Sequence, residues 1–70
     1  MFGYRFTFTA HFEWYNGNGS YENDVMFTKD IYFDSEPTEM ELIEATSRVR
    51  REFDQLRYRK VKVTYEPITV

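Results

Sequence analysis

FGYRFTFTAHFEWY, residues 2–15, decides the fold of this chain because apolar and polar side chains alternate along its whole length. A period of two, built from aromatic and β-branched residues, is typical of a strand. We therefore expect a strand over 2–15 with one face buried and the other exposed to water. The even positions form the buried face: Phe2, Tyr4, Phe6, Phe8, Ala10, Phe12 and Trp14. The odd positions form the exposed face: Gly3, Arg5, Thr7, Thr9, His11, Glu13 and Tyr15.

A second strand is expected over residues 21–33, after the turn sequence NGNGS. Its apolar positions are odd, so the hairpin must pair residues whose numbers add to an odd value. A two- or four-residue loop gives that register, and a turn centred on Asn16-Gly17 or Asn18-Gly19 satisfies it. Lys29 interrupts the apolar set and indicates either a bulge or an edge strand. The apolar set is Val25, Phe27, Ile31 and Phe33.

One helix is expected within residues 34–56, and a third strand follows over 58–66. Thr38 and Glu41 have the spacing of a capping box at the start of the helix. Pro67 is expected to end the regular pairing of the third strand. The apolar stripe of the helix is Leu42, Thr46, Val49, Phe53 and Leu56, with Ile43 and Ala45 at its flanks. The inward residues of the third strand are Val61, Val63 and Tyr65.

These elements predict a single α+β domain over residues 1–70, with the order β-β-α-β. The most apolar strand should be central, which gives a three-stranded antiparallel sheet in the order 2-1-3. The helix should pack across one face of this sheet and leave the other face open. We expect that open face to include Arg5, Thr7, Thr9, His11, Glu13, Tyr15, Met26, Thr28, Asp30, Tyr32, Tyr58, Lys60, Lys62 and Thr64.

The composition argues against an enzyme. There is no Cys and only one His, His11, so neither a thiolate metal site nor a cluster of His ligands is expected. A single imidazole with no orienting partner is a weak catalytic candidate, and no small-molecule substrate, metal or other cofactor is expected. No secretory signal and no apolar run of bilayer length is present, which favours a cytoplasmic location. A core this small favours a partner subunit, and a homodimer or other homo-oligomer is one candidate.

Charge is segregated along the chain. Residues 13–44 contain nine acids and one Lys, whereas residues 45–62 contain seven bases and two acids. The acidic pole should lie at the helix start and the end of the second strand. The basic pole should lie at the helix end and the start of the third strand, beside the NGNG turn, with Lys60 or Lys62 near Glu13 and His11. Such a polarised surface steers charged partners.

The expected function is that of a small non-enzymatic regulatory protein that binds another protein, as an adaptor or inhibitor of a larger host or viral machine. The alternative is a nucleic-acid-binding protein with Arg51, Arg57, Arg59, Lys60 and Lys62 on phosphates and Tyr58 stacking on a base. The net charge of -3 disfavours that alternative, since dedicated nucleic-acid binders are usually basic. The residues expected to bind a partner are Tyr32, Tyr58, Arg59, Lys60, Lys62, Arg51, Glu39, Glu41 and Glu44.

Overall fold

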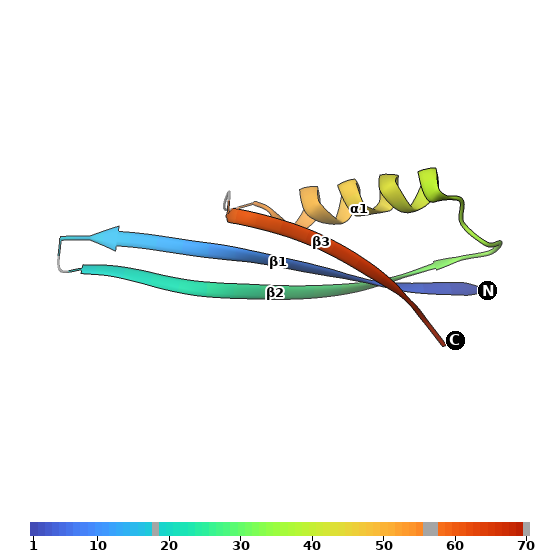
Figure 1. Cartoon of the computed structure of the whole chain (residues 1–70), viewed down its shortest axis with the longest axis horizontal. Helices are drawn as coiled ribbons and strands as arrows, with labels where there is room; N and C mark the ends of the chain where they lie inside the picture. The colour runs from blue at the N-terminus through green and yellow to red at the C-terminus, as the bar shows by residue number, and fades with distance from the viewer. Residues whose placement is uncertain (18, 56–57, 70) are drawn as a thin grey trace.

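A computed structural model describes residues 1–17, 19–55 and 58–69 of the chain. The predicted order β-β-α-β is confirmed, and the four elements follow one another as Figure 1 shows. Residues 18, 56, 57 and 70 lie outside the described residues, and among them Asn18, Leu56 and Arg57 carry predictions made above. The side chain of Trp14 also lies outside the description. The elements are β1 (Phe2–Asn16), β2 (Gly19–Phe33), α1 (Glu39–Phe53) and β3 (Arg59–Ile68).

The three strands form one sheet in the order β2-β1-β3, and β1 runs antiparallel to both neighbours. The predicted α+β fold is therefore confirmed. The helix lies over β1 and β3 on one side of the sheet. The strand with the longest apolar alternation occupies the centre, where both of its edges are hydrogen-bonded and its apolar side chains meet the helix.

The β1–β2 ladder runs without interruption from the pair Phe2–Phe33 to the pair Asn16–Gly19. The two-residue loop and the odd register are as predicted, but the turn falls between the two predicted positions. Gly19 has a φ of +147°, a conformation that L side chains rarely adopt. Moving a two-residue turn by one position changes the sum of paired residue numbers by two, so the sum stays odd and the same side chains stay on the same face. The side-chain alternation is therefore compatible with several turn positions and does not select one of them.

The even face of β1 forms the centre of the core. Phe6 and Phe8 are 0% exposed, and Ala10 is also buried. This confirms the predicted inward face in the middle of the strand, whereas Phe2 at its start is 42% exposed. From the helix, Leu42 and Val49 are buried as predicted. The helix residues at the flanks differ: Ala45 is buried in the core, whereas Ile43 is 52% exposed.

The helix begins with the predicted capping box. The Thr38 hydroxyl accepts a hydrogen bond from the Glu41 backbone N–H at 3.2 Å, and the Glu41 carboxylate accepts one from the Thr38 backbone N–H at 3.3 Å. These contacts satisfy two backbone donors that the first turn of a helix leaves free. The boundary of α1 therefore follows directly from the sequence.

A β-bulge at the start of β3 corrects one sequence prediction. Lys60 has a φ of +53°, and the pairing with β1 shifts between Thr9 and His11, so that His11 faces Arg59. The extra residue moves Tyr58 from the open face to the helix side of the sheet. There its ring contacts Phe8 and Phe12, with centroids 6.0 and 5.9 Å apart.

The far end of β3 also differs from the prediction. Its ladder with β1 does not end before Pro67, since Tyr4 pairs with Pro67 and Gly3 pairs with Ile68. Proline is tolerated here because β3 is an edge strand, so its missing N–H leaves no neighbouring strand without a donor.

The hairpin of β1 and β2 projects beyond the rest of the molecule (Figure 1). Within the described part of the chain, β3 pairs no further along β1 than His11. The strand continues to Asn16, about 17 Å farther at the usual rise per residue. The molecule is accordingly elongated, 52 × 21 × 13 Å. The start of β3 therefore does not lie beside the NGNG turn, as predicted, but roughly five residues short of it.

Candidate functional site

The candidate functional site is the sheet face opposite the helix, called the open face below. Cross-strand pairs define it, and they place the odd side chains of β1 beside the even side chains of β2. Met26 and Tyr32 are 68% and 51% exposed on this face. The residues of the open face are Arg5, Thr7, Thr9, His11, Glu13, Tyr15, Glu22, Asp24, Met26, Thr28, Asp30, Tyr32, Arg59, Lys62, Thr64 and Glu66.

One end of the open face carries a forked ion pair. Arg5 Nε lies 2.8 Å from Asp30 Oδ1, and Arg5 Nη2 lies 3.1 Å from Asp30 Oδ2. The hydrogen bonds from the guanidinium lower the pKa of Asp30 and the same contact raises the pKa of Arg5. Glu66 lies opposite Arg5 on the third strand. A bidentate pair of this kind fixes both side chains and orders that end of the face.

The other end is organised around His11. Its Nδ1 lies 3.0 Å from Asp24 Oδ1, and its Nε2 lies 3.2 Å from Glu13 Oε1. The hydrogen bond to Asp24 is the main cause that raises the pKa of His11, while desolvation opposes the rise and Glu13 adds to it. Arg59 Nη1 lies 3.2 Å from the other oxygen of Glu13. Both imidazole nitrogens are therefore engaged by carboxylates.

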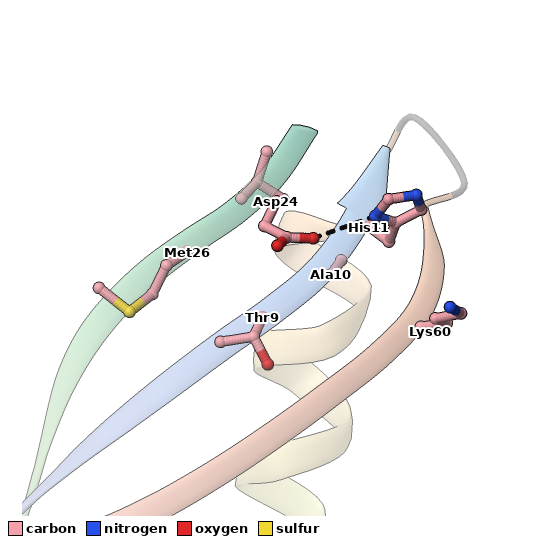
Figure 2. A pocket seen from close by; sticks show the side chains of 7 residues that line it. Thr9, Ala10, His11, Asp24, Met26 and Lys60 are labelled. Atoms are coloured by element: carbon pink, nitrogen blue, oxygen red, sulfur yellow. Dashed lines mark hydrogen bonds and ion pairs between the residues drawn. The ribbon is translucent and has the colours of Figure 1, made fainter. Parts of the chain in front are cut away.

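A shallow depression of about 430 Å³ lies on the open face next to His11. Figure 2 shows Met26 on β2 at one side, Lys60 on β3 at the other, and Asp24 bonded to His11 at one end. Thr9 lies between the two walls. The depression thus has an acidic and apolar wall on β2 and a basic wall on β3.

The structure brings together only some of the predicted partner-binding residues. Arg59, Lys60 and Lys62 gather at the edge of the open face, with Lys62 opposite Thr9. It is Arg59, and not Lys60 or Lys62 as predicted, that contacts Glu13, because the bulge places Arg59 opposite His11. Tyr32 lies on β2 toward the Arg5 end. Tyr58 is on the helix side.

The remaining predicted residues lie on the helix, which covers the opposite side of the sheet. Glu39 and Glu41 belong to its first turn, and Glu41 completes the capping box. Glu44 and Arg51 are exposed along its outer surface. These four side chains share no surface with the open face.

Glu22 and Asp24 were not among the open-face residues predicted from the sequence. They lie directly opposite Glu13 and His11 on the hairpin. The odd register of the hairpin could have placed both on the open face, because it puts every even residue of β2 there. Their position opposite Glu13 and His11 depends on the turn, which lies one position away from either predicted centre. Together, His11, Glu13 and Glu22 offer one ligand atom each within 4.8 Å of one another.

Both edges of the sheet carry features that oppose pairing with another strand. On β2, Lys29 points to the helix side, and its Nζ lies 2.6 Å from Glu52 Oε2. The pairing of β1 with β2 continues without a shift through Lys29, so of the two predicted explanations the edge strand is confirmed and the bulge is wrong. On β3, the bulge at Lys60 and the proline at position 67 interrupt a regular edge. Inward charges, bulges and prolines are devices that natural proteins use to protect edge strands.

Among the described residues, no helix has the length and apolar character needed to cross a membrane. Comparison with protein families found no family model that matches this chain, and comparisons with curated proteins and with solved structures found no match either.

Proposed function

We propose that this chain is a small non-enzymatic protein that acts in the cytoplasm by binding another protein through its open face. The observation that carries the proposal is the contrast between this face and the rest of the sheet. The helix lies over β1 and β3 on one side of the sheet, and both edges carry protective features. The open face instead presents exposed Met26 between the His11–Asp24 and Arg5–Asp30 pairs, and exposed Tyr32 beyond Asp30. Methionine, tyrosine and arginine are enriched at protein interfaces.

The charges of the open face suggest the chemistry of the partner. Around His11 and the depression, its β2 side carries Glu22 and Asp24, and its β3 side carries Arg59 and Lys62. A complementary surface would place a basic group over β2 and an acidic group over β3, with an apolar side chain in the depression beside Met26. Such complementarity favours specificity and the rate of association. An adaptor or an inhibitor of a larger assembly would use such a surface.

His11 supports binding more than catalysis. When the ring is protonated, Asp24 and Glu13 each accept a hydrogen bond from it, so in that form neither nitrogen can accept a proton from a substrate. The depression beside it is shallow and open, whereas catalytic groups usually lie in a cleft that excludes water.

For the alternative of nucleic-acid binding, three of the predicted basic residues are exposed, but the residue predicted to stack on a base lies on the helix side of the sheet. Arg59, Lys60 and Lys62 are exposed, but Arg59 is bonded to Glu13 and the Tyr58 ring packs against Phe8 and Phe12. We therefore expect no binding to single- or double-stranded oligonucleotides at about 50 mM salt, where phosphate contacts are strong.

Two exposed methionines give a matched test of the proposal. Met26 on the open face is 68% exposed and Met40 on the helix is 66% exposed. We expect Met26→Lys to abolish capture of the partner protein from host lysate and Met40→Lys to leave capture unchanged, with the circular dichroism spectrum of both variants unaltered. Loss of capture with Met40→Lys alone, or capture unaffected by Met26→Lys, would contradict the proposal.

A further inference from the structure

Two neighbouring cross-strand pairs concentrate ligand groups on the hairpin. His11 faces Asp24 and Glu13 faces Glu22, all four on the open face. One imidazole and three carboxylates thus lie within a single patch of two strands. The structure brings one ligand atom each from His11, Glu13 and Glu22 to within 4.8 Å of one another.

The patch has a local excess of negative charge. Glu13 and Glu22 are directly opposed, and like charges in that relation are destabilising. Arg59 offsets part of the excess, but it contacts Glu13 through Oε2 and leaves Oε1 facing the imidazole. A cation placed between Glu13 and Glu22 would remove the remaining repulsion.

Asp24 holds His11 in the orientation that a metal ligand needs. Its carboxylate bonds Nδ1 at 3.0 Å, so Nε2 points toward Glu13. Metal-binding histidines almost always bond a carboxylate or carbonyl through the nitrogen that does not bind the metal. The His11 side chain is 18% exposed, so its orientation is fixed by its surroundings as well.

The spacing suits a small tetrahedral ion. With zinc–ligand distances of about 2.0–2.2 Å, neighbouring ligand atoms lie about 3.4 Å apart. Nε2 of His11 and Oε1 of Glu13 are already 3.2 Å apart. Glu22 is exposed, and one of its carboxylate oxygens lies within 4.8 Å of the other two ligand atoms.

We propose that His11 Nε2 and the carboxylates of Glu13 and Glu22 bind a zinc ion, with Asp24 as a positioning residue. A mixed set of imidazole and carboxylate ligands favours zinc over magnesium or calcium, which prefer oxygen ligands alone. In the zinc-bound form the ion takes the place of the proton on Nε2, and water completes the tetrahedron.

Zinc bound here would tie β1 to β2 beside Arg59, the first residue of β3. Beyond His11, the described part of β1 pairs with β2 alone. A two-stranded ribbon is marginally stable in water. The ion would therefore order the projecting hairpin in a chain that has no disulfide.

Isothermal titration of the full chain with zinc chloride tests the proposal. We expect one ion per chain, with binding retained in about 10 mM magnesium chloride because magnesium disfavours imidazole. Glu22→Gln should weaken binding at least about tenfold, and so should Asp24→Asn through the orientation of His11. Glu36→Gln removes an exposed acid from the far end of the molecule and should leave binding unchanged.

Arg59→Gln provides a variant with the opposite expected effect. It removes a cation beside Glu13 and should tighten zinc binding. Amide resonances of residues 11, 13, 22 and 24 should shift most when zinc is added to labelled protein. The proposal is overturned if no heat and no shift appear up to about 1 mM zinc. It is equally overturned if Glu22→Gln binds as the natural chain does, or if the shifts centre on residues 34–36.

Discussion

Lys29 Nζ lies 2.6 Å from Glu52 Oε2, an ion pair that joins the exposed edge strand β2 to the helix α1. Lys29 occupies a position where the alternation of β2 would place an apolar residue, opposite the fully buried Phe6. Its charge contributes little to folding, since ion pairs at the surface stabilise by about 0–1 kcal/mol. Its larger effect is to place a charge on an edge that is otherwise apolar on the helix side.

We expect Lys29→Val to increase self-association through β2, because it removes the inward charge that protects this edge. Sedimentation equilibrium would show dimers or larger species that the natural chain lacks at the same concentration. Lys29→Arg keeps the charge and serves as the control. A monomeric Lys29→Val variant would show that other features protect the edge.

Phe8 should be among the most sensitive positions in the chain. It is 0% exposed and its ring lies 5.9 Å from Phe53 and 6.1 Å from Phe27. Phe8→Ala should lower the free energy of unfolding by about 3–5 kcal/mol. That is a large part of the total of about 4–10 kcal/mol expected for a domain of this length. Urea denaturation measures the loss, and Thr9→Ala on the opposite face should change little.

The bulge predicts different tolerances for two neighbouring lysines. Lys60 has a φ of +53°, where β-branched side chains are strained, whereas Lys62 lies in the regular ladder. Lys60→Val should therefore lower the free energy of unfolding by about 1–3 kcal/mol more than Lys62→Val does. Lys60→Gly should be tolerated. Equal effects of valine at both positions in thermal denaturation would argue against a positive φ at residue 60.

The pair of Arg5 and Asp30 predicts a pH dependence of stability. Arg5 lowers the pKa of Asp30 in the folded chain, so the unfolded chain binds the proton more readily. The stabilisation is present above the ordinary pKa of an aspartate and is lost as the pH falls through the lower folded value. In Arg5→Gln, melting temperature should depend less steeply on pH in this acid range. An unchanged slope would show that the pair does not contribute.

The sequence predicted the elements whose signals are local. The alternation over residues 2–15 identified the central strand and its buried face, and Thr38 with Glu41 marked the start of the helix. The odd register followed from the two apolar patterns. The turn position did not follow from these patterns, because registers that differ by two in the sum of paired residue numbers bury the same faces of both strands.

The bulge and its consequences left no signal in the sequence. Positive φ is usually marked by glycine or asparagine, and here a lysine adopts it at residue 60. One extra residue there moves Tyr58 to the core side and brings Arg59 to Glu13. The cluster around His11 depends on the same tertiary details, since Asp24 and Glu22 reach it only through the observed register.

The role of the open face can be tested most directly by a photo-crosslinking amino acid placed at position 26 or at position 40 in the host cell. Both side chains are largely exposed, on opposite sides of the molecule. We expect a crosslinked protein partner from position 26 and none from position 40. A partner crosslinked from position 40 and not from position 26 would contradict it.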